Sequence, residues 1–204
     1  MRNKKLYATL IAGALAVSMM GTTVMASTAS TTANGQTKFT YSPGTAGPTD
    51  PIAPGNEENA NNNWMVTYPR TITLMDNNEA EAAQASTKGQ AVAFTVKQRQ
   101  AGADNSDKVT AGNVGDGIQV SGTWTGGNSD IAMNATSGGS TVKMGLVASG
   151  TTAFLNSGGT VTTLTVADPD NEGYAVIKTG QVSQAVEGAT YTATIDFTFT
   201  RTGN

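Results

Sequence analysis

The C-terminal stretch GATYTATIDFTFTRTGN, residues 188–204, constrains the fold more than any other part of the chain. Apolar and polar residues alternate along it. The apolar positions are Tyr191, Ala193, Ile195, Phe197 and Phe199, and the polar ones are Thr192, Thr194, Asp196, Thr198 and Thr200. A period of two indicates a β-strand with one buried face. Because a strand needs a neighbour for its main-chain hydrogen bonds, this stretch predicts a β-sheet protein.

The same alternation recurs through the second two thirds of the chain. The predicted strands lie in residues 64–77, 91–100, 117–127, 130–136, 140–149, 158–168 and 173–182. Gly-rich or Asp/Asn-rich turns separate them at the spacing typical of a sandwich or barrel. Only residues 78–88 have a helical composition, and they predict a loop or one short helix. We therefore expect an all-β, antiparallel β-sandwich of the Greek-key or Ig-like type over residues 64–204.

The first 26 residues predict a secretory signal peptide. Arg2, Lys4 and Lys5 form a positive region, residues 6–21 are mostly apolar, and Ala26 supplies a small residue for cleavage. The apolar run is shorter than the 18 to 20 or so residues of a transmembrane helix. We expect a secreted, cell-surface-associated protein with no membrane span after the signal is cleaved.

The segment between the signal and the main domain predicts a tethered strand. Residues 27–36 are small and polar and predict a disordered start. Residues 37–42 predict a short strand, in which Phe39 and Tyr41 are the large apolar side chains. Residues 43–63 hold four prolines, three glycines and five asparagines and predict a linker.

Composition restricts the chemistry. The chain has no cysteine and no histidine, which rules out disulfides, thiolate sites and any catalysis or metal ligation by histidine. Once the signal is removed, nine basic residues remain against fifteen acidic ones, a net charge of −6. Nucleic acid and anionic membranes are poor partners for such a chain. We expect a protein that is not an enzyme and has no cofactor or metal.

Two weaker patterns leave alternatives open. The run DPDNEG, residues 168–173, resembles the start of a calcium loop, but Thr179 stands where such a loop needs a bidentate glutamate, so a hairpin turn is preferred. Lys97, Lys143 and Lys178 lie in predicted strands and are candidates for isopeptide bonds to asparagine, although no spacing singles out a pair. Trp124 falls on the same face of its predicted strand as Ile118 and Val120, so we expect it to be a core residue.

The chain combines the predicted signal with KFTYSPGT (38–45), GPTDPIAPGN (47–56) and the closing GATYTATIDFTFT (188–200). This order of segments resembles that of secreted surface proteins of low-GC Gram-positive bacteria, in particular the WxL-type wall-binding proteins. The resemblance implies a β-sandwich, secretion and association with the cell wall. Where that family has its Trp-x-Leu strand, this chain has Ile195-Asp196-Phe197-Thr198-Phe199.

Two functions follow as expectations. The first is a non-enzymatic surface or extracellular-matrix structural protein that binds the wall or assembles with itself. In it the N-terminal strand either closes its own sandwich or is donated to a neighbouring copy; the candidate interface residues are Phe39, Tyr41, Ile195, Phe197 and Phe199. The alternative is a carbohydrate- or peptidoglycan-binding module, with Trp64 and Tyr68 as candidate glycan contacts.

Overall fold

A computed structural model describes residues 32–41, 43, 54–55, 64–98 and 111–203. The predicted signal peptide, the first residues of the predicted disordered start and most of the predicted linker lie outside the described residues. Within the described part no helix combines the length and hydropathy that a membrane crossing requires.

Strands dominate the structure and helices are short. The strands are β1 (Thr32–Tyr41), β2 (Pro54–Gly55), β3 (Trp64–Pro69), β4 (Thr71–Leu74), β5 (Glu79–Ala80), β6 (Gln90–Gln98), β7 (Gly117–Thr123), β8 (Ile131–Ala135), β9 (Thr141–Val147), β10 (Thr160–Leu164), β11 (Asp170–Lys178) and β12 (Tyr191–Thr202). The helical segments are η1 (Asp76–Asn78), η2 (Ala82–Gln84), α2 (Ala85–Lys88), α3 (Ala111–Val114) and η3 (Val182–Gln184). The all-β prediction is confirmed.

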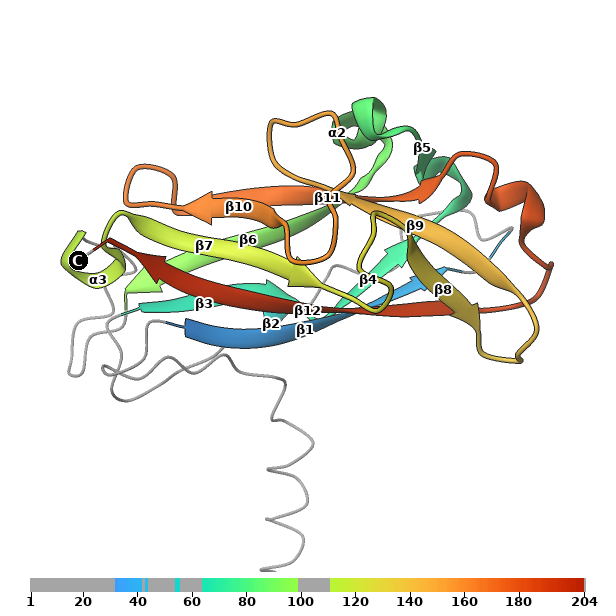
Figure 1. Ribbon diagram of the computed structural model, residues 1–204, viewed down its shortest axis with the longest axis horizontal. Coiled ribbons are helices and arrows are strands. Elements are labelled where there is room, and N and C mark those ends of the chain that lie inside the picture. Colours follow the sequence, from blue (N-terminus) through green and yellow to red (C-terminus); the bar gives the residue numbers. More distant parts are fainter. Residues whose placement is uncertain (1–31, 42, 44–53, 56–63, 99–110, 204) are drawn as a thin grey trace, which may run out of the picture.

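The strands form one curled, barrel-like sheet (Figure 1). Its main path is β10-β7-β12-β8-β9-β11-β6-β3-β2, and β1 joins it by pairing with both β12 and β4. Since β3 continues into β4 through Arg70, the chain passes from a strand that pairs with β6 to one that pairs with β1. This continuity brings the two sides of the sheet around one core.

The prediction of a purely antiparallel sheet was wrong. β1 runs parallel to β4, and β5 runs parallel to β11. A parallel pair needs a crossover connection, and residues 42–63 supply it between β1 and β3. The predicted arrangement of two separate sheets is replaced by a single continuous sheet of mixed direction.

The N-terminal strand is longer than predicted. It begins at Thr32 rather than residue 37, so residues 32–36 are paired with β12 instead of being disordered. These residues, TANGQ, carry no large apolar side chain, and their strand conformation comes from main-chain pairing along the full ten-residue register. These residues show no alternation of apolar and polar side chains, so the sequence pattern could not predict a strand there.

The core is filled by the side chains that strand alternation predicts. Phe39, Tyr41, Ile195, Phe197 and Phe199 are fully buried. The ring of Phe94 from β6 packs edge-on against Phe197, with 5.0 Å between centroids. Trp124 is also buried, with 8% of its surface exposed, which confirms its predicted core position. The aromatic pairs join both sides of the curled sheet.

A second, smaller apolar cluster covers another face of the sheet. It combines Ala80, Ala82 and Ala85 with Val147 of β9 and Val176 of β11, and Phe154 packs against it. The segment predicted as a loop or short helix therefore contributes two short helices, η2 and α2, beside β11 (Figure 1). Its alanines are small enough to let the main chain approach the sheet closely.

Candidate functional site

Two regions of the molecule hold candidate functional residues. The first, called here the β1–β12 seam, consists of β1 and the residues of β12 and β4 that pair with it. β1 is antiparallel to β12 from Thr32↔Thr200 to Tyr41↔Tyr191, and parallel to β4 from Lys38↔Thr71 to Tyr41↔Leu74. β12 therefore pairs with the whole of β1, whereas β4 covers the other edge of β1 only from Lys38 to Tyr41.

Two contacts to the β3–β4 corner fix β1 in its middle. The Lys38 N–H donates to the Arg70 carbonyl at 2.8 Å. The hydroxyl of Thr37, a buried polar side chain, donates to the carbonyl of Pro69. Both bonds satisfy groups that would be costly to bury unpaired.

Gly35 lies against an aromatic ring in the same seam. A Cβ atom at this position would stand 2.5 Å from Cζ of Tyr68, and the Gln36 N–H donates to the Tyr68 hydroxyl at 3.4 Å. The missing side chain of Gly35 therefore provides the space for the Tyr68 ring.

The C-terminal end of β1 carries the most perturbed titratable group of the seam. Tyr41 is stacked on Tyr191, with 5.9 Å between ring centroids, and its hydroxyl donates to Oδ1 of Asp76 at 2.8 Å. Burial, and then the hydrogen bond and charge of Asp76, raise the pKa of Tyr41 well above its ordinary value. The phenol is therefore held neutral.

The predicted interface residues all belong to this seam. Phe39, Tyr41, Ile195, Phe197 and Phe199 are buried by the pairing of β1 and β12 within one chain. The five side chains therefore form core contacts and leave no exposed apolar patch at the seam in the single chain. Any strand exchange would have to reproduce the same contacts between copies.

The predicted glycan contacts do not lie on an exposed face. Trp64 and Tyr68 are 5% and 1% exposed, because these two side chains of β3 point into the core. Tyr68 packs on Phe199 with 5.5 Å between ring centroids. Neither ring offers a flat face to a sugar in this structure.

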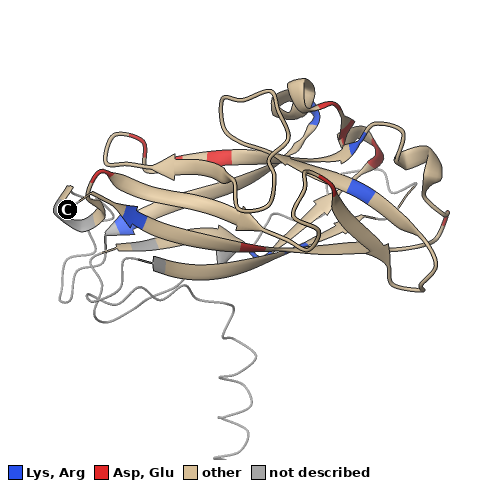
Figure 2. Cartoon of the chain, in the orientation of Figure 1, with Lys and Arg blue, Asp and Glu red and all other residues tan. Residues whose placement is uncertain are grey.

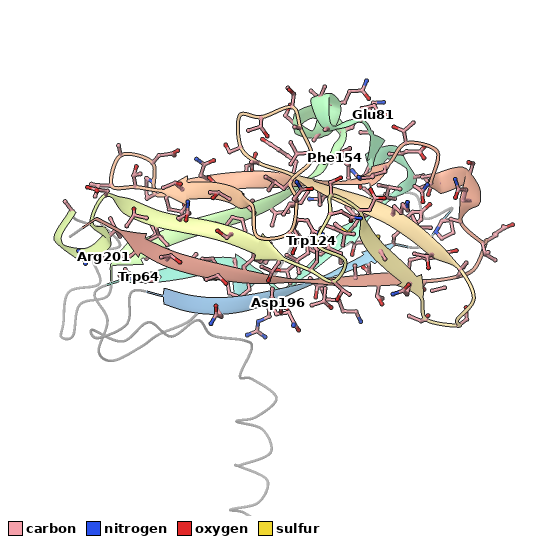
Figure 3. All side chains as sticks on the ribbon, in the orientation of Figure 1. Trp64, Glu81, Trp124, Phe154, Asp196 and Arg201 are labelled. Atoms are coloured by element: carbon pink, nitrogen blue, oxygen red, sulfur yellow. The ribbon has the colours of Figure 1, made fainter. Side chains whose placement is uncertain are left out.

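The second region is a groove that sequence reasoning missed. We call it the Asp130 groove; its volume is about 590 Å³. It lies between the β7–β8 connection, β8, β9 and the start of β12, and its lining residues are Trp124, Thr125, Gly126, Asn128, Asp130, Ile131, Ala132, Asn134, Lys143, Thr192, Ala193 and Thr194. Figure 3 shows Trp124 near the middle of the molecule, where this connection leaves β7.

The β7–β8 connection is held by hydrogen bonds at both ends. The indole N–H of Trp124 donates to the Asn128 carbonyl at 2.8 Å, and the Asp130 N–H donates to the Asn128 side-chain oxygen at 3.0 Å. The Ser157 hydroxyl accepts a bond from the main-chain N–H of Trp124 and donates one to the main-chain carbonyl of the same residue. These bonds give the groove a defined wall.

A charged cluster stands at one end of the groove. Asp130 pairs with Lys143, with 2.8 Å between Nζ and Oδ2, and also with Lys178. Lys178 in turn lies over the Phe154 ring, 4.3 Å from its centroid. Hydrogen bonds from Lys143 and then Lys178 lower the pKa of Asp130, so its carboxylate is ionised at neutral pH.

This cluster bears on the isopeptide hypothesis. Lys143 and Lys178, two of the three candidate lysines, share one carboxylate rather than an asparagine amide. Amide formation at a carboxyl group needs the protonated acid, and the low pKa of Asp130 disfavours that form. Lys97 lies in β6, away from that carboxylate in the strand order. The pair geometry is that of an ion pair.

The calcium-loop motif folds differently from a metal loop. β11 already begins at Asp170, and the Asn171 side chain donates to Asp168 at 2.8 Å while Ser149 donates to Asn171 at 2.9 Å. In the described part of the chain, no three acidic side chains converge as a metal site would require. The residues serve the connection between β10 and β11. These two strands do not pair with each other, because β10 pairs with β7 and β11 with β6 and β9, so the preferred interpretation as a hairpin turn was wrong.

A scan against protein-family models found no match, and searches of curated proteins and of solved structures found no similar protein.

Proposed function

We propose that this protein is a non-enzymatic, secreted structural protein of the cell surface or extracellular matrix that assembles with itself by exchanging β1 between copies. The observation that carries the proposal is the position of β1, which pairs with β12 along its full length and inserts Lys38–Tyr41 into the slot between β12 and β4. A long connection separates β1 from the rest of the sheet. The slot binds its strand by main-chain pairing and aromatic burial, the two means by which donated strands bind.

The connection is long enough to allow either partner. In one chain, Tyr41 lies beside Leu74, and Trp64 begins the β3–β4 run ten residues earlier. Because this run extends along β1, with Tyr68 at Gly35 and Thr71 at Lys38, residues 42–63 must span roughly 33 Å. Twenty-two residues reach roughly 70 Å when extended. A tethered strand has an effective concentration in the millimolar range, so pairing within the chain dominates in dilute solution and exchange requires high local concentration.

Cysteine pairing tests the exchange directly, because the chain has no cysteine of its own. Lys38 and Thr194 are opposite each other in the β1–β12 register and both are exposed. Directly opposed residues have Cβ atoms about 5 Å apart, near disulfide distance. Lys38→Cys and Thr194→Cys variants, unfolded together and refolded at high concentration, are expected to form a mixed disulfide dimer.

A matched pair and a shortened connection complete the test. Lys38→Cys mixed with Thr163→Cys, an exposed position on β10, should give only background dimer. Deleting residues 44–60 leaves a reach of about 20 Å, too short for pairing within one chain, and should produce oligomers by light scattering. Monomers from the deletion, together with equal dimer yields from both cysteine pairs, would overturn the proposal.

A second candidate function is a carbohydrate- or peptidoglycan-binding module. It is favoured by the Asp130 groove, whose volume lies in the range of small-ligand sites and whose lining is rich in hydroxyl, amide and charged groups. Cosedimentation with purified Gram-positive cell walls tests it. An Asn134→Ala, Thr194→Ala double variant should then release the protein from the pellet, whereas cosedimentation unchanged by that variant would exclude the groove.

A further inference from the structure

The polar groups that line the Asp130 groove leave much of their hydrogen-bonding capacity unused. Asn134 accepts a bond from Thr141 through its side-chain oxygen, which leaves its amide N–H groups for a ligand. Among the described residues, the hydroxyls of Thr192 and Thr194 have no side-chain hydrogen bond, and Thr194 is exposed. Since these side chains come from β8 and β12, they stand on rigid strands rather than on a loop.

The charged end of the groove has an excess of one positive charge. Asp130 carries one negative charge and contacts two ammonium groups, those of Lys143 and Lys178. The Lys178 side chain is 16% exposed and holds its place over Phe154, whereas that of Lys143 is 51% exposed and lies at the groove. Lys143 therefore has N–H donors for a second anion.

This excess is notable against the rest of the molecule. Charged side chains are sparse along the strands (Figure 2), and the chain carries a net charge of −3 even with its basic first residues included. A site of local positive charge on an acidic protein selects its anion by short-range contact, because the surrounding field does not attract anions from a distance.

We propose that the Asp130 groove binds an acidic saccharide, with a carboxylate of the sugar on Nζ of Lys143 and ring hydroxyls on Asn134 and Thr194. The proposal rests on the second candidate function and names its ligand class. A volume of about 590 Å³ lies in the range of small-molecule sites and exceeds what a single small anion needs. The buried position of Trp124 makes hydrogen bonding and charge, rather than ring stacking, the source of affinity.

The test compares two trimers of the same linkage, an oligogalacturonate and the neutral galactose trimer, on the full mature chain. Binding is measured by calorimetry, and the site is located by NMR shifts of the groove residues. Because a hydrogen bond to a charged group contributes more than a neutral one, we expect the acidic trimer to bind at least about tenfold more tightly. Its affinity should also fall as salt is raised.

Three variants give effects of opposite sign. Lys143→Gln should weaken the acidic trimer about tenfold and leave the neutral trimer unchanged. Asp130→Asn removes the competing carboxylate and should tighten the acidic trimer several-fold. Lys88→Gln, an exposed lysine on α2, is the matched control and should change neither.

The outcomes separate the inference from the function on which it rests. Equal affinity for both trimers, or insensitivity to Lys143→Gln, would overturn the acidic preference while leaving saccharide binding in place. Tighter binding of inorganic phosphate than of the acidic trimer would also overturn it, because the groove would then recognise an anion alone. If neither trimer binds and wall cosedimentation also fails, the ligand and the second candidate function fall together.

Discussion

The β1–β12 seam and the Asp130 groove both include residues of β12, yet they are built on opposite principles. The inner face of the seam is dry, since Phe39, Phe197 and Phe199 are fully buried. Its outer face carries exposed polar contacts, such as the bond from Gln36 to Asp196. The groove is more polar: beside Trp124 and Ile131, its lining holds hydroxyls, amides and an ion-paired carboxylate. One strand supplies both because its side chains alternate between inside and outside.

The comparison shows where stability and recognition reside. Burial makes the seam expensive to alter, so its residues determine whether the domain folds and which strand fills the slot. The exposed polar side chains of the groove, such as Asn134 and Thr194, contribute little burial, so we expect them to tolerate substitution and to be available for a ligand. The substitutions below test this difference between the seam and the groove, in order of decreasing effect on stability.

The largest effect is expected from Phe197→Ala. The ring is fully buried and contacts Phe94, and loss of a core phenylalanine costs about 3 to 5 kcal/mol. Asn134→Ala in the groove should change the free energy of unfolding by no more than about 0.5 kcal/mol. Urea unfolding followed by circular dichroism measures both; equal effects would contradict the division between seam and groove.

A change of intermediate size is expected from Gly35→Val. The new side chain meets the Tyr68 ring, and overpacking of a core costs about 1 to 3 kcal/mol. The double variant with Tyr68→Leu should recover part of that loss, since the smaller side chain leaves room. If the two substitutions are additive in urea unfolding, the Gly35–Tyr68 contact is not the cause.

Sequence reasoning predicted the seam better than the groove for a physical reason. Alternation is a local pattern, so the sequence alone is enough to place Phe39, Phe197 and Phe199 on apolar strand faces. It did not predict that Gly35 would be covered by Tyr68, because that contact joins residues 33 positions apart. Parallel pairing of β1 with β4 has the same long-range origin.

The groove had almost no local signal. Asp130, Lys143 and Lys178 are spread over three elements, and only the strand order brings their charges together. The aromatic residues that composition suggested for a glycan, Trp64 and Tyr68, serve the core instead. The turn NSD at residues 128–130 marks a loop, but nothing in its spacing predicts a double ion pair.

A smaller effect is expected at the end of the seam from Tyr41→Phe. Losing the hydrogen bond to Asp76 should cost about 0.5 to 1.5 kcal/mol near neutral pH. Because the folded-state pKa of Tyr41 is raised, the stabilisation of its neutral form is present below the unfolded pKa, about 10, and is lost as the pH rises above it. Both proteins share the raised pKa of Tyr174, so their difference isolates Tyr41. A stability gap between them that stays constant from about pH 8 to pH 11 would contradict this assignment.

The smallest effect is expected from Asp130→Asn, and it is the one that distinguishes the groove by its charge. The folded-state pKa of Asp130 is lowered by Lys143 and Lys178. Its stabilisation is therefore present above the unfolded pKa, near 4, and lost as the pH falls through the lower folded value. Because both the carboxylate and Lys143 are partly exposed, the contribution at pH 7 should not exceed about 1 kcal/mol and should shrink in salt. Asp170→Asn, at an exposed position of β11, is the matched control for the loss of one negative charge. If Asp130→Asn leaves the acid limb of the stability profile unchanged, the ion pairs of Asp130 do not stabilise the fold.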